Sequence, residues 1–349
     1  MPIICPRCGT TAPDGAAFCE RDGTQLRETT AETPMPSASL TVSLPVPTPA
    51  TGCRCGAGPE ARADGYCNSC GRKWVEPRKP LPRDHVELAL SLSFAGVTDR
   101  GQRHSKNEDD FAISFTGAGA AVLVVCDGVS SSEEADRASA IAAKTMCARL
   151  SEPTTDGEGA FREAVAAANV AVCALHSNAP GATSAPPETT VVAAIVRERA
   201  AILGWVGDSR AYWIDSSDPT AARLLSHDHS WLNEVVDSGE MTAAEAGKNR
   251  LAHAITRCLG TFDDPSTSEP TITEFAFGAA GGYLLLCSDG LWNYAESPAQ
   301  IAALVHAAPQ SEGAVAIARH LVAWANAQGG RDNITVALLA VPADDTATI

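Results

Sequence analysis

Carboxylate side chains recur at the ends of the apolar runs in this sequence, and this placement could build a metal site. Each one taken alone is typical of an ordinary turn, because Asp and Gly favour tight connections between strands. Together they supply the oxygen ligands that Mg²⁺ and Mn²⁺ prefer, and no His or Cys accompanies them, which argues against zinc or copper. Without a cation, such a cluster would repel itself and shift its own pKa values. The carboxylates concerned are Glu108, Asp109, Asp127, Asp208, Asp289 and Asp332.

Strand-like and helix-like runs must position these carboxylates. Runs rich in Val, Ile, Leu and aromatic residues predict strands over 88–97, 110–115, 121–126, 189–196, 200–206, 210–214, 283–287 and 333–341. Apolar residues at helical spacing predict helices over 133–150, 160–177, 298–307 and 311–328. Short connections, such as the one within 200–214, indicate antiparallel pairing. The pattern predicts one packed domain of helices and strands over residues 87–343.

A second kind of candidate site lies near the N-terminus, where seven of the twelve cysteines fall within the first 70 residues. Residues 52–75 hold Cys53, Cys55, Cys67 and Cys70, a spacing typical of four thiolates around one tetrahedral zinc ion. The alternative is reduced surface cysteines without a metal. A module this short has too little core to fold unaided, so we favour zinc.

The first cysteine module, residues 1–27, has an unusual fourth position. It holds Cys5, Cys8 and Cys19, and Asp22 stands where a fourth cysteine would be expected. A carboxylate can bind zinc, so a Cys₃Asp site is one interpretation. A water molecule or a ligand from elsewhere in the chain would complete the site otherwise. The chain is therefore expected to bind one or two structural zinc ions.

Composition separates these modules from the main domain and excludes some functions. Residues 28–51 are rich in Pro, Thr and Ser, which predicts a linker, and a shorter linker is predicted over 76–86. The net charge of −16 argues against a nucleic-acid-binding protein, which needs a basic face. No apolar run is long enough to span a membrane, and the N-terminus lacks the pattern of a signal peptide. We therefore expect a soluble, cytoplasmic protein with no nucleic-acid or membrane partner.

Five segments that contain the carboxylates resemble the motifs of one family in the expected order. The sequence resembles the metal-dependent protein phosphatases of type 2C, chiefly their bacterial branch, over residues 90–341. The segments are 98–109 (TDRGQRHSKNED), 125–128 (VCDG), 205–211 (WVGDSRA), 287–292 (CSDGLW) and 330–335 (GRDNIT). The N-terminal modules resemble zinc ribbons.

The resemblance implies both a fold and an activity. The implied fold is of the α+β class, a four-layer α-β-β-α sandwich of two antiparallel sheets flanked by helices, preceded here by the small zinc ribbons. The implied activity is hydrolysis of phosphoserine and phosphothreonine in proteins, with phosphoprotein substrates of Ser/Thr kinases. A water between two Mn²⁺ or Mg²⁺ ions would attack phosphorus in line, with no phosphoenzyme. The ribbons would dock a protein partner.

The same resemblance implies a role for each residue at the strand ends. Asp127 would bridge the two metal ions, and Asp109 would act through bound waters. The remaining ligands would be the carbonyl of Gly128 and Glu108 for the second ion, Asp289 and Asp332 for the first, and Asp208 for a third, weaker ion.

Two departures from the family pattern leave an alternative open. His104 stands where the family usually has the Arg that binds phosphate, with Arg103 beside it, so Arg103, His104 or Lys106 could take that role. Asn293 replaces a common acidic residue, which would weaken the third metal site. The alternative is a weakly active or inactive phosphatase fold that acts as a binding or scaffold protein through its ribbons. Because the principal metal-ligand positions are retained, we favour the enzyme.

Overall fold

The computed structural model describes residues 3–4, 11–12, 57, 59–64, 66–71, 80–154, 156–176, 185–218, 220–261 and 264–344. The chain divides into two units, Met1–Leu40 and Thr41–Ile349. In the first unit, β1 (Ile3–Ile4) pairs antiparallel with β2 (Thr11–Ala12). Cys5, Cys8, Cys19, Asp22, Cys53 and Cys55 lie outside the described residues, as does the predicted linker over 28–51.

The described part of the second cysteine module is a small hairpin. The 3₁₀ turn η1 (Pro59–Ala61) leads into β3 (Arg62–Ala63), which pairs with β4 (Tyr66–Cys67). The Cys67 carbonyl accepts hydrogen bonds from the backbone N–H groups of Gly71, at 2.7 Å, and Cys70, at 3.4 Å. The chain therefore turns tightly between the two cysteines, as the spacing predicts.

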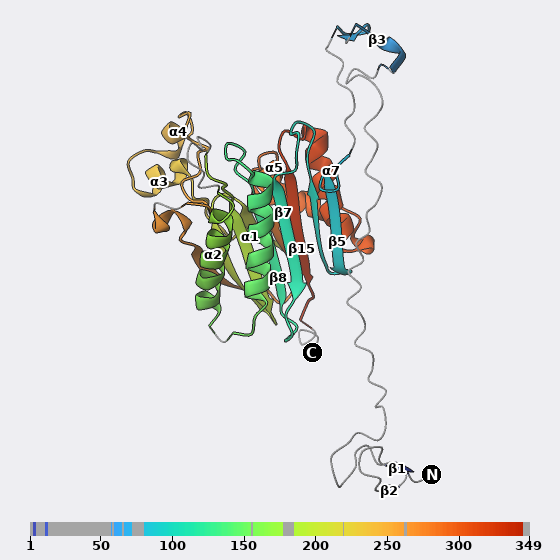
Figure 1. The fold of residues 1–349 in the computed structure, drawn as a ribbon, viewed down its shortest axis with the longest axis vertical. Coiled ribbons are helices and arrows are strands. Elements are labelled where there is room, and N and C mark those ends of the chain that lie inside the picture. The colour runs from blue at the N-terminus through green and yellow to red at the C-terminus, as the bar shows by residue number, and fades with distance from the viewer. Residues whose placement is uncertain are drawn as a thin grey trace. The chain divides into compact units, whose positions relative to one another are not determined.

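Two antiparallel sheets form the centre of the main domain (Figure 1). The five-stranded sheet has the order β13-β10-β9-β8-β7, with β7 at Asp109–Phe115, β8 at Ala121–Asp127, β9 at Val191–Arg197, β10 at Ala200–Val206 and β13 at Thr271–Ala276. The six-stranded sheet has the order β12-β11-β14-β15-β6-β5, with β5 at His85–Ser91, β6 at Phe94–Asp99, β11 at Arg210–Asp215, β12 at Ala222–Leu224, β14 at Gly282–Cys287 and β15 at Ile334–Val341. All neighbouring strands in both sheets run antiparallel.

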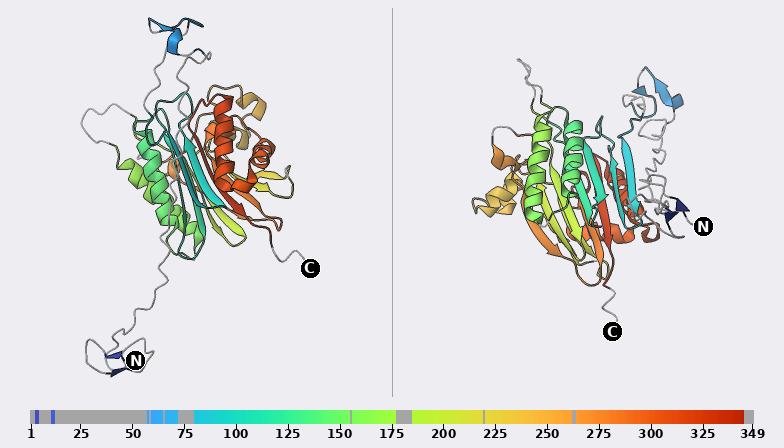
Figure 2. Two further views of the ribbon diagram at one scale, coloured as in Figure 1. Left: turned by 90° about the vertical axis from the view of Figure 1, so that its right-hand side faces the viewer. Right: turned by 60° about the horizontal axis from the view of Figure 1, so that its bottom comes forward.

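Helices cover the outer face of each sheet, which gives four layers (Figure 2). The helices α1 (Ala135–Leu150) and α2 (Gly157–Cys173) pack on the five-stranded sheet. The six-stranded sheet carries α5 (Asp289–Trp292), α6 (Pro298–Ala307) and α7 (Ala314–Gln328), with the 3₁₀ turn η3 (Gln310–Glu312) before α7. The predicted α-β-β-α sandwich is confirmed.

The sequence of β8 shows why its apolar run is continuous. Val122, Val124 and Cys126 pack against the helical layer, whereas Leu123 and Val125 alternate with them and face the other sheet. A strand covered on both faces has no solvent-exposed position for a polar side chain. Its first polar residue, Asp127, is therefore the point at which the strand leaves the core.

Several predicted boundaries were wrong. The predicted strand over 88–97 is two strands, β5 and β6, which turn at Leu92, whose side chain is 80% exposed. No Gly or Pro marks this turn, so the apolar run concealed it. Strand β5 also begins at His85 and Asp84 is buried, so the domain starts within the predicted linker over 76–86. The short strands β12 and β13 were not predicted.

The connection over 231–260 holds the short helices α3 (Trp231–Asp237) and α4 (Ala243–Ala246), and a 3₁₀ turn, η2 (Pro265–Ser268), follows it. Thr242 caps α4 and Ser297 caps α6, each in a capping box.

Among the described residues, the helices are all too short or too polar to cross a lipid bilayer.

Candidate metal centre

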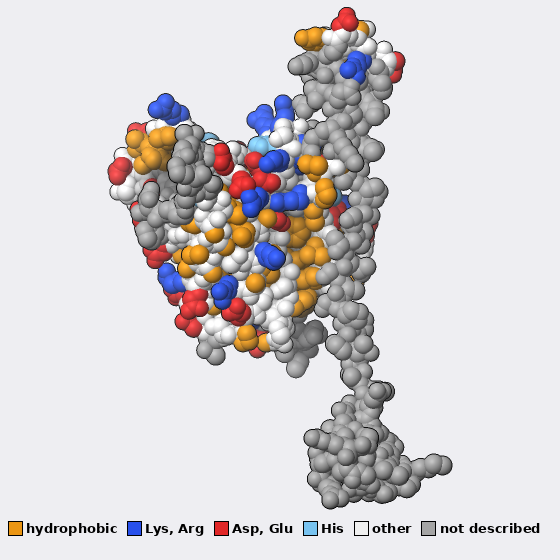
Figure 3. Space-filling view, in the orientation of Figure 1, with side chains coloured by type: hydrophobic (Ala, Val, Ile, Leu, Met, Phe, Trp, Pro, Cys, Tyr) orange, Lys and Arg blue, Asp and Glu red, His pale blue; other side chains and the backbone are white. Residues whose placement is uncertain are grey.

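The antiparallel topology brings the candidate carboxylates to one end of the two sheets. Asp109 is the first residue of β7 and Asp127 the last of β8, and the two are direct partners in the ladder. Asp289 follows β14 and Asp332 precedes β15, the neighbouring antiparallel strand. Asp208 lies in the connection from β10 to β11. Figure 3 shows acidic side chains at this end of the domain, over the start of α1 and next to Lys and Arg side chains.

These carboxylates repel one another. Burial, followed by the charges of Asp109, Asp289, Asp208 and Asp332, raises the pKa of Asp127 well above its usual value. The pKa of Asp289 is raised well above its usual value in the same way. Burial is also the main reason that the pKa of Asp109 rises to about 7 and that of Asp208 to about 6. Such shifts are typical of buried carboxylates that lie close to other carboxylates.

The oxygen atoms at this end fit a hard divalent cation. Asp109 Oδ2 accepts hydrogen bonds from the hydroxyls of Ser288, at 2.7 Å, and Thr335, at 2.8 Å. Asp109 Oδ1 and Asp289 Oδ1 are buried and have no hydrogen-bond partner. Within the described residues, no three His, Cys, Asp or Glu side chains already converge on one metal position, so the carboxylates would have to turn inward to bind a cation. Unpartnered buried oxygens and mutual repulsion are the features that a bound cation would relieve.

Gly128 allows the backbone to approach Glu108 closely. Its N–H donates to the Glu108 carbonyl at 3.1 Å. A Cβ atom at this position would lie 2.6 Å from that carbonyl oxygen and 2.5 Å from the carbonyl oxygen of Ala135. Only glycine fits here without moving the backbone. The Glu108 side chain is held by Ser130, whose hydroxyl donates to Oε2 at 2.7 Å.

Of the neighbours Arg103 and His104, the structure brings only His104 to the carboxylates. His104 Nε2 lies 3.2 Å from Asp332 Oδ1, and Nδ1 lies 3.8 Å from Glu108 Oε2. Arg103 is exposed and makes no ion pair with any described residue. The imidazole therefore stands between two candidate ligands of different metal ions.

The family follows from comparison with known proteins. Residues 98–326 match the family model of protein phosphatase 2C. The chain belongs to this family. It is 28% identical to the serine/threonine phosphatase stp of Listeria monocytogenes, over 69% of this chain and 93% of that protein.

Solved structures agree with this assignment. The serine/threonine phosphatase Stp1 from Staphylococcus aureus is 27% identical, with a TM-score of 0.60 over 76% of this chain and 99% of that one. The catalytic domain of the serine/threonine protein phosphatase PstP, in complex with two manganese ions, is 28% identical, with a TM-score of 0.57 over 71% of this chain and 97% of that one. This chain is a serine/threonine protein phosphatase, and the predicted family and the predicted fold of the phosphatase domain are confirmed.

Several residues that position this phosphatase's carboxylates were not identified from the sequence. The Trp292 indole donates to the Asp208 carbonyl at 3.1 Å, and the Arg210 guanidinium lies 3.7 Å above the Trp292 ring. Arg210 in turn forms an ion pair with Asp228 at 2.7 Å. Asn293, which we expected to weaken the site, donates to Asp289 Oδ2 at 2.9 Å. Arg210 and Trp292 lie in the family-like segments 205–211 and 287–292, but Trp292 contacts Asp208, 84 residues away along the chain.

Proposed function

We propose that this phosphatase hydrolyses phosphoserine and phosphothreonine in proteins with Mn²⁺ or Mg²⁺ held by the carboxylates at the end of the two sheets. The observation that carries the proposal is the group of buried carboxylates whose pKa values are raised by burial and by one another. The manganese complex of PstP supports a two-metal site. The candidate ligands are Glu108, Asp127, Gly128, Asp289 and Asp332, with Asp208 at a third, weaker site.

The proposed chemistry divides between the cations and the chain. When bound, the cations would lower the pKa of a water molecule and offset negative charge on the phosphoryl oxygens. Asp109, held by the Ser288 and Thr335 hydroxyls, would orient water molecules. His104 would contact the phosphate from its position beside Asp332. In the reaction, the water oxygen bonds to phosphorus and the P–O ester bond breaks. The leaving Ser or Thr oxygen takes up a proton and becomes a hydroxyl.

The nearby thiols support a mechanism without a phosphoenzyme. Cys126 and Cys287 adjoin the site but are fully buried. Burial raises the pKa of both thiols, so neither is a thiolate near neutral pH. A buried thiol of raised pKa is a poor nucleophile.

We also propose zinc in the N-terminal modules. The second site would use Cys53, Cys55, Cys67 and Cys70, and the tight turn between the last two supports it. The first would use Cys5, Cys8, Cys19 and Asp22. We place the enzyme in the cytoplasm as part of this proposal, because thiolate sites of this kind persist in a reducing compartment. Its proposed substrates are the phosphoprotein products of Ser/Thr kinases. Metal analysis of the purified chain tests this part: one or two zinc ions per chain are expected, and none would contradict it.

An activity assay tests the enzyme. Wild-type protein should hydrolyse p-nitrophenyl phosphate and a phosphothreonine peptide when Mn²⁺ is present and lose turnover with a chelator. Asp127→Ala and Asp289→Asn should each reduce kcat by about 10³-fold or more, because each removes a candidate metal ligand. Folded wild-type protein without turnover at any Mn²⁺ concentration would contradict the proposal and would favour the scaffold alternative.

A further inference from the structure

The chain enters the phosphatase domain through residues 80–84, here named the lead-in segment, directly before β5. Arg83 reaches from this segment to the corner that carries Asp109. Its guanidinium donates to the Asp109 carbonyl at 3.0 Å and to the Asp136 carbonyl, and it forms an ion pair with Asp110 Oδ2 at 3.1 Å. One side chain therefore ties the start of β7 and the first turn of α1 to the lead-in segment.

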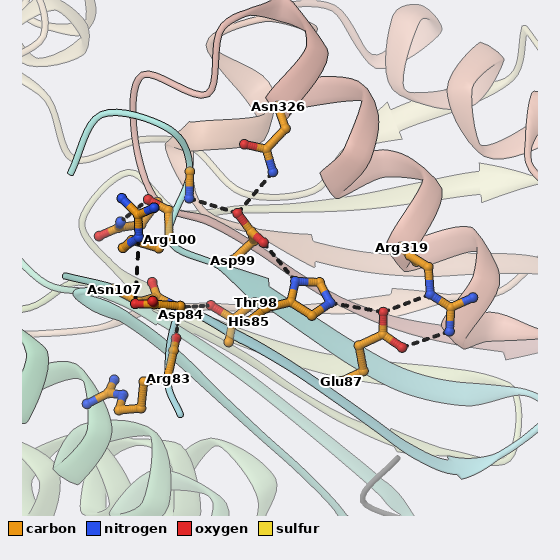
Figure 4. Close-up of polar contacts among 12 residues, drawn as sticks. Arg83, Asp84, His85, Glu87, Thr98, Asp99, Arg100, Asn107, Arg319 and Asn326 are labelled. Atoms are coloured by element: carbon orange, nitrogen blue, oxygen red, sulfur yellow. Dashed lines mark hydrogen bonds and ion pairs between the residues drawn. The ribbon is translucent and has the colours of Figure 1, made fainter. Parts of the chain in front are cut away.

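The backbone of Arg83 is tied to the carboxylate of Asp109 as well. Its carbonyl accepts a hydrogen bond from Asn107 Nδ2 at 3.0 Å, and the same amide donates to Thr98 Oγ1 at 2.9 Å. Thr98 Oγ1 lies 2.6 Å from Thr335 Oγ1, and the Thr335 hydroxyl donates to Asp109 Oδ2. Figure 4 shows the start of this path, at Arg83, Asn107 and Thr98.

The groups at the two ends of this chain of hydrogen bonds decide which partner donates in each bond. The Asn107 NH₂ group can only donate, and at the other end Asp109 Oδ2 accepts from the Thr335 hydroxyl. Each hydroxyl between them has one proton, so Thr98 must donate to Thr335. The four side chains beyond Arg83 are at most 3% exposed, so water does not compete for these bonds.

Asp84, also in the lead-in segment, contacts the loop that carries His104. The Asp84 carbonyl accepts from the backbone N–H of Arg100 at 2.8 Å, and Asp84 Oδ1 lies 3.6 Å from Arg100 Nε. The Arg100 guanidinium in turn donates to the His104 carbonyl. Gly101, at φ +71°, follows Arg100, and a Cβ there would lie 2.0 Å from the Asp332 carbonyl oxygen. The lead-in segment therefore contacts both the start of β7 and the His104 loop, which lie on two sides of the candidate metal centre.

We propose that Arg83 is a positioning residue for metal binding: it fixes the corner from which Glu108 and Asp109 project, without touching substrate or metal. The inference rests on the proposed function of the carboxylates. A guanidinium can bond two carbonyls and a carboxylate at once, whereas a lysine ammonium cannot match that geometry. Partners that orient metal ligands commonly change metal affinity 10–100-fold when removed.

The test measures Mn²⁺ binding to the full chain by calorimetry and, separately, the Mn²⁺-induced rise in Tm. Arg83→Ala is expected to raise the Kd for Mn²⁺ by about tenfold and to reduce the rise in Tm. Arg83→Lys keeps the charge near Asp110 and should recover only part of the affinity.

The matched control is Arg319→Ala. The side chains of Arg83 and Arg319 are both 37% exposed, and both form ion pairs, but Arg319 pairs with Glu87 and has no contact with residues 107–110. This variant should lower Tm and leave the Kd for Mn²⁺ within about twofold of wild type, because it acts on global stability alone.

Two results would overturn the proposal: wild-type Mn²⁺ affinity in Arg83→Ala, or an equal loss of affinity in Arg319→Ala. Calorimetry detects binding without turnover. A wild type that binds Mn²⁺ but hydrolyses nothing would therefore contradict the proposed function, while the comparison of variants would still decide the role of Arg83.

Discussion

Two polar clusters within the same domain use charge in opposite ways. At the candidate metal centre, carboxylates face carboxylates, and burial with mutual repulsion raises their pKa values. In the network of His85, Glu87, Asp99 and Arg319, named the His85 network, opposite charges alternate (Figure 4). Hydrogen bonds that His85 donates to the Asp99 and Glu87 carboxylates raise the pKa of His85 to about 9.

Glu87 shows the contrast at a single carboxylate. Burial opposes its ionisation, but hydrogen bonds from Arg319 and His85 outweigh burial and lower its pKa to about 2. Arg319 binds both Glu87 oxygens at 2.7 Å. The His85 network thus supplies its own counter-charges, whereas the proposed metal centre would need a cation from outside the chain to offset its negative charge.

The largest expected effect comes from breaking the His85 network. Arg319→Ala leaves the Glu87 carboxylate, which is 3% exposed, without its bidentate partner. Removing one partner of a buried ion pair costs 3–5 kcal/mol, and because Arg319 is partly exposed we expect about 3 kcal/mol of unfolding free energy. Urea unfolding measures this. Arg162→Ala, at an exposed ion pair, is the control and should unfold like wild type; an unchanged Arg319→Ala would show that the network contributes nothing.

A smaller effect is expected from raising the pH. The folded pKa of His85, about 9, lies above its unfolded value, so its stabilisation is complete below about pH 6.5 and is lost as pH rises through 9. Between pH 6.5 and 9.5, wild type should lose about 2 kcal/mol more unfolding free energy than His85→Gln. Urea unfolding with a chelator present measures the difference between the two proteins. Parallel pH profiles would contradict the raised pKa.

The smallest expected effect has the opposite sign. At neutral pH the metal-free protein carries the cost of an Asp127 whose pKa is raised, and Asn removes that charge. Asp127→Asn should therefore stabilise the chelated protein, on the order of 1 kcal/mol or roughly 2–4 °C in Tm. The same variant should lose the Mn²⁺-induced rise in Tm. A lower Tm in the chelator would show that Asp127 stabilises the fold without a cation.

The sequence predicted the elements whose signals are local. The helix over 298–307 agrees with α6 because Ser297 and Pro298 mark its start. The carboxylates were identified because each directly adjoins an apolar run. The turn between β5 and β6 was missed because nothing local marks it.

Distant partners explain what the sequence could not show about the site. Arg319 and Glu87 are 232 residues apart, and Thr335 and Asp109 are 226 apart. Such pairs depend on which strands become neighbours in the sheets, and the spacing of residues along the chain does not predict them.

The sequence by itself determined that six carboxylates end or begin core strands, since a strand buried on both faces tolerates polar residues only at its ends. The antiparallel order of the sheets then decided that these ends meet. Only the tertiary structure decided that His104, and not its neighbour Arg103, faces them. The reason is that Arg100, held by Asp84, fixes the loop so that His104 turns toward Asp332 while Arg103 stays in solvent.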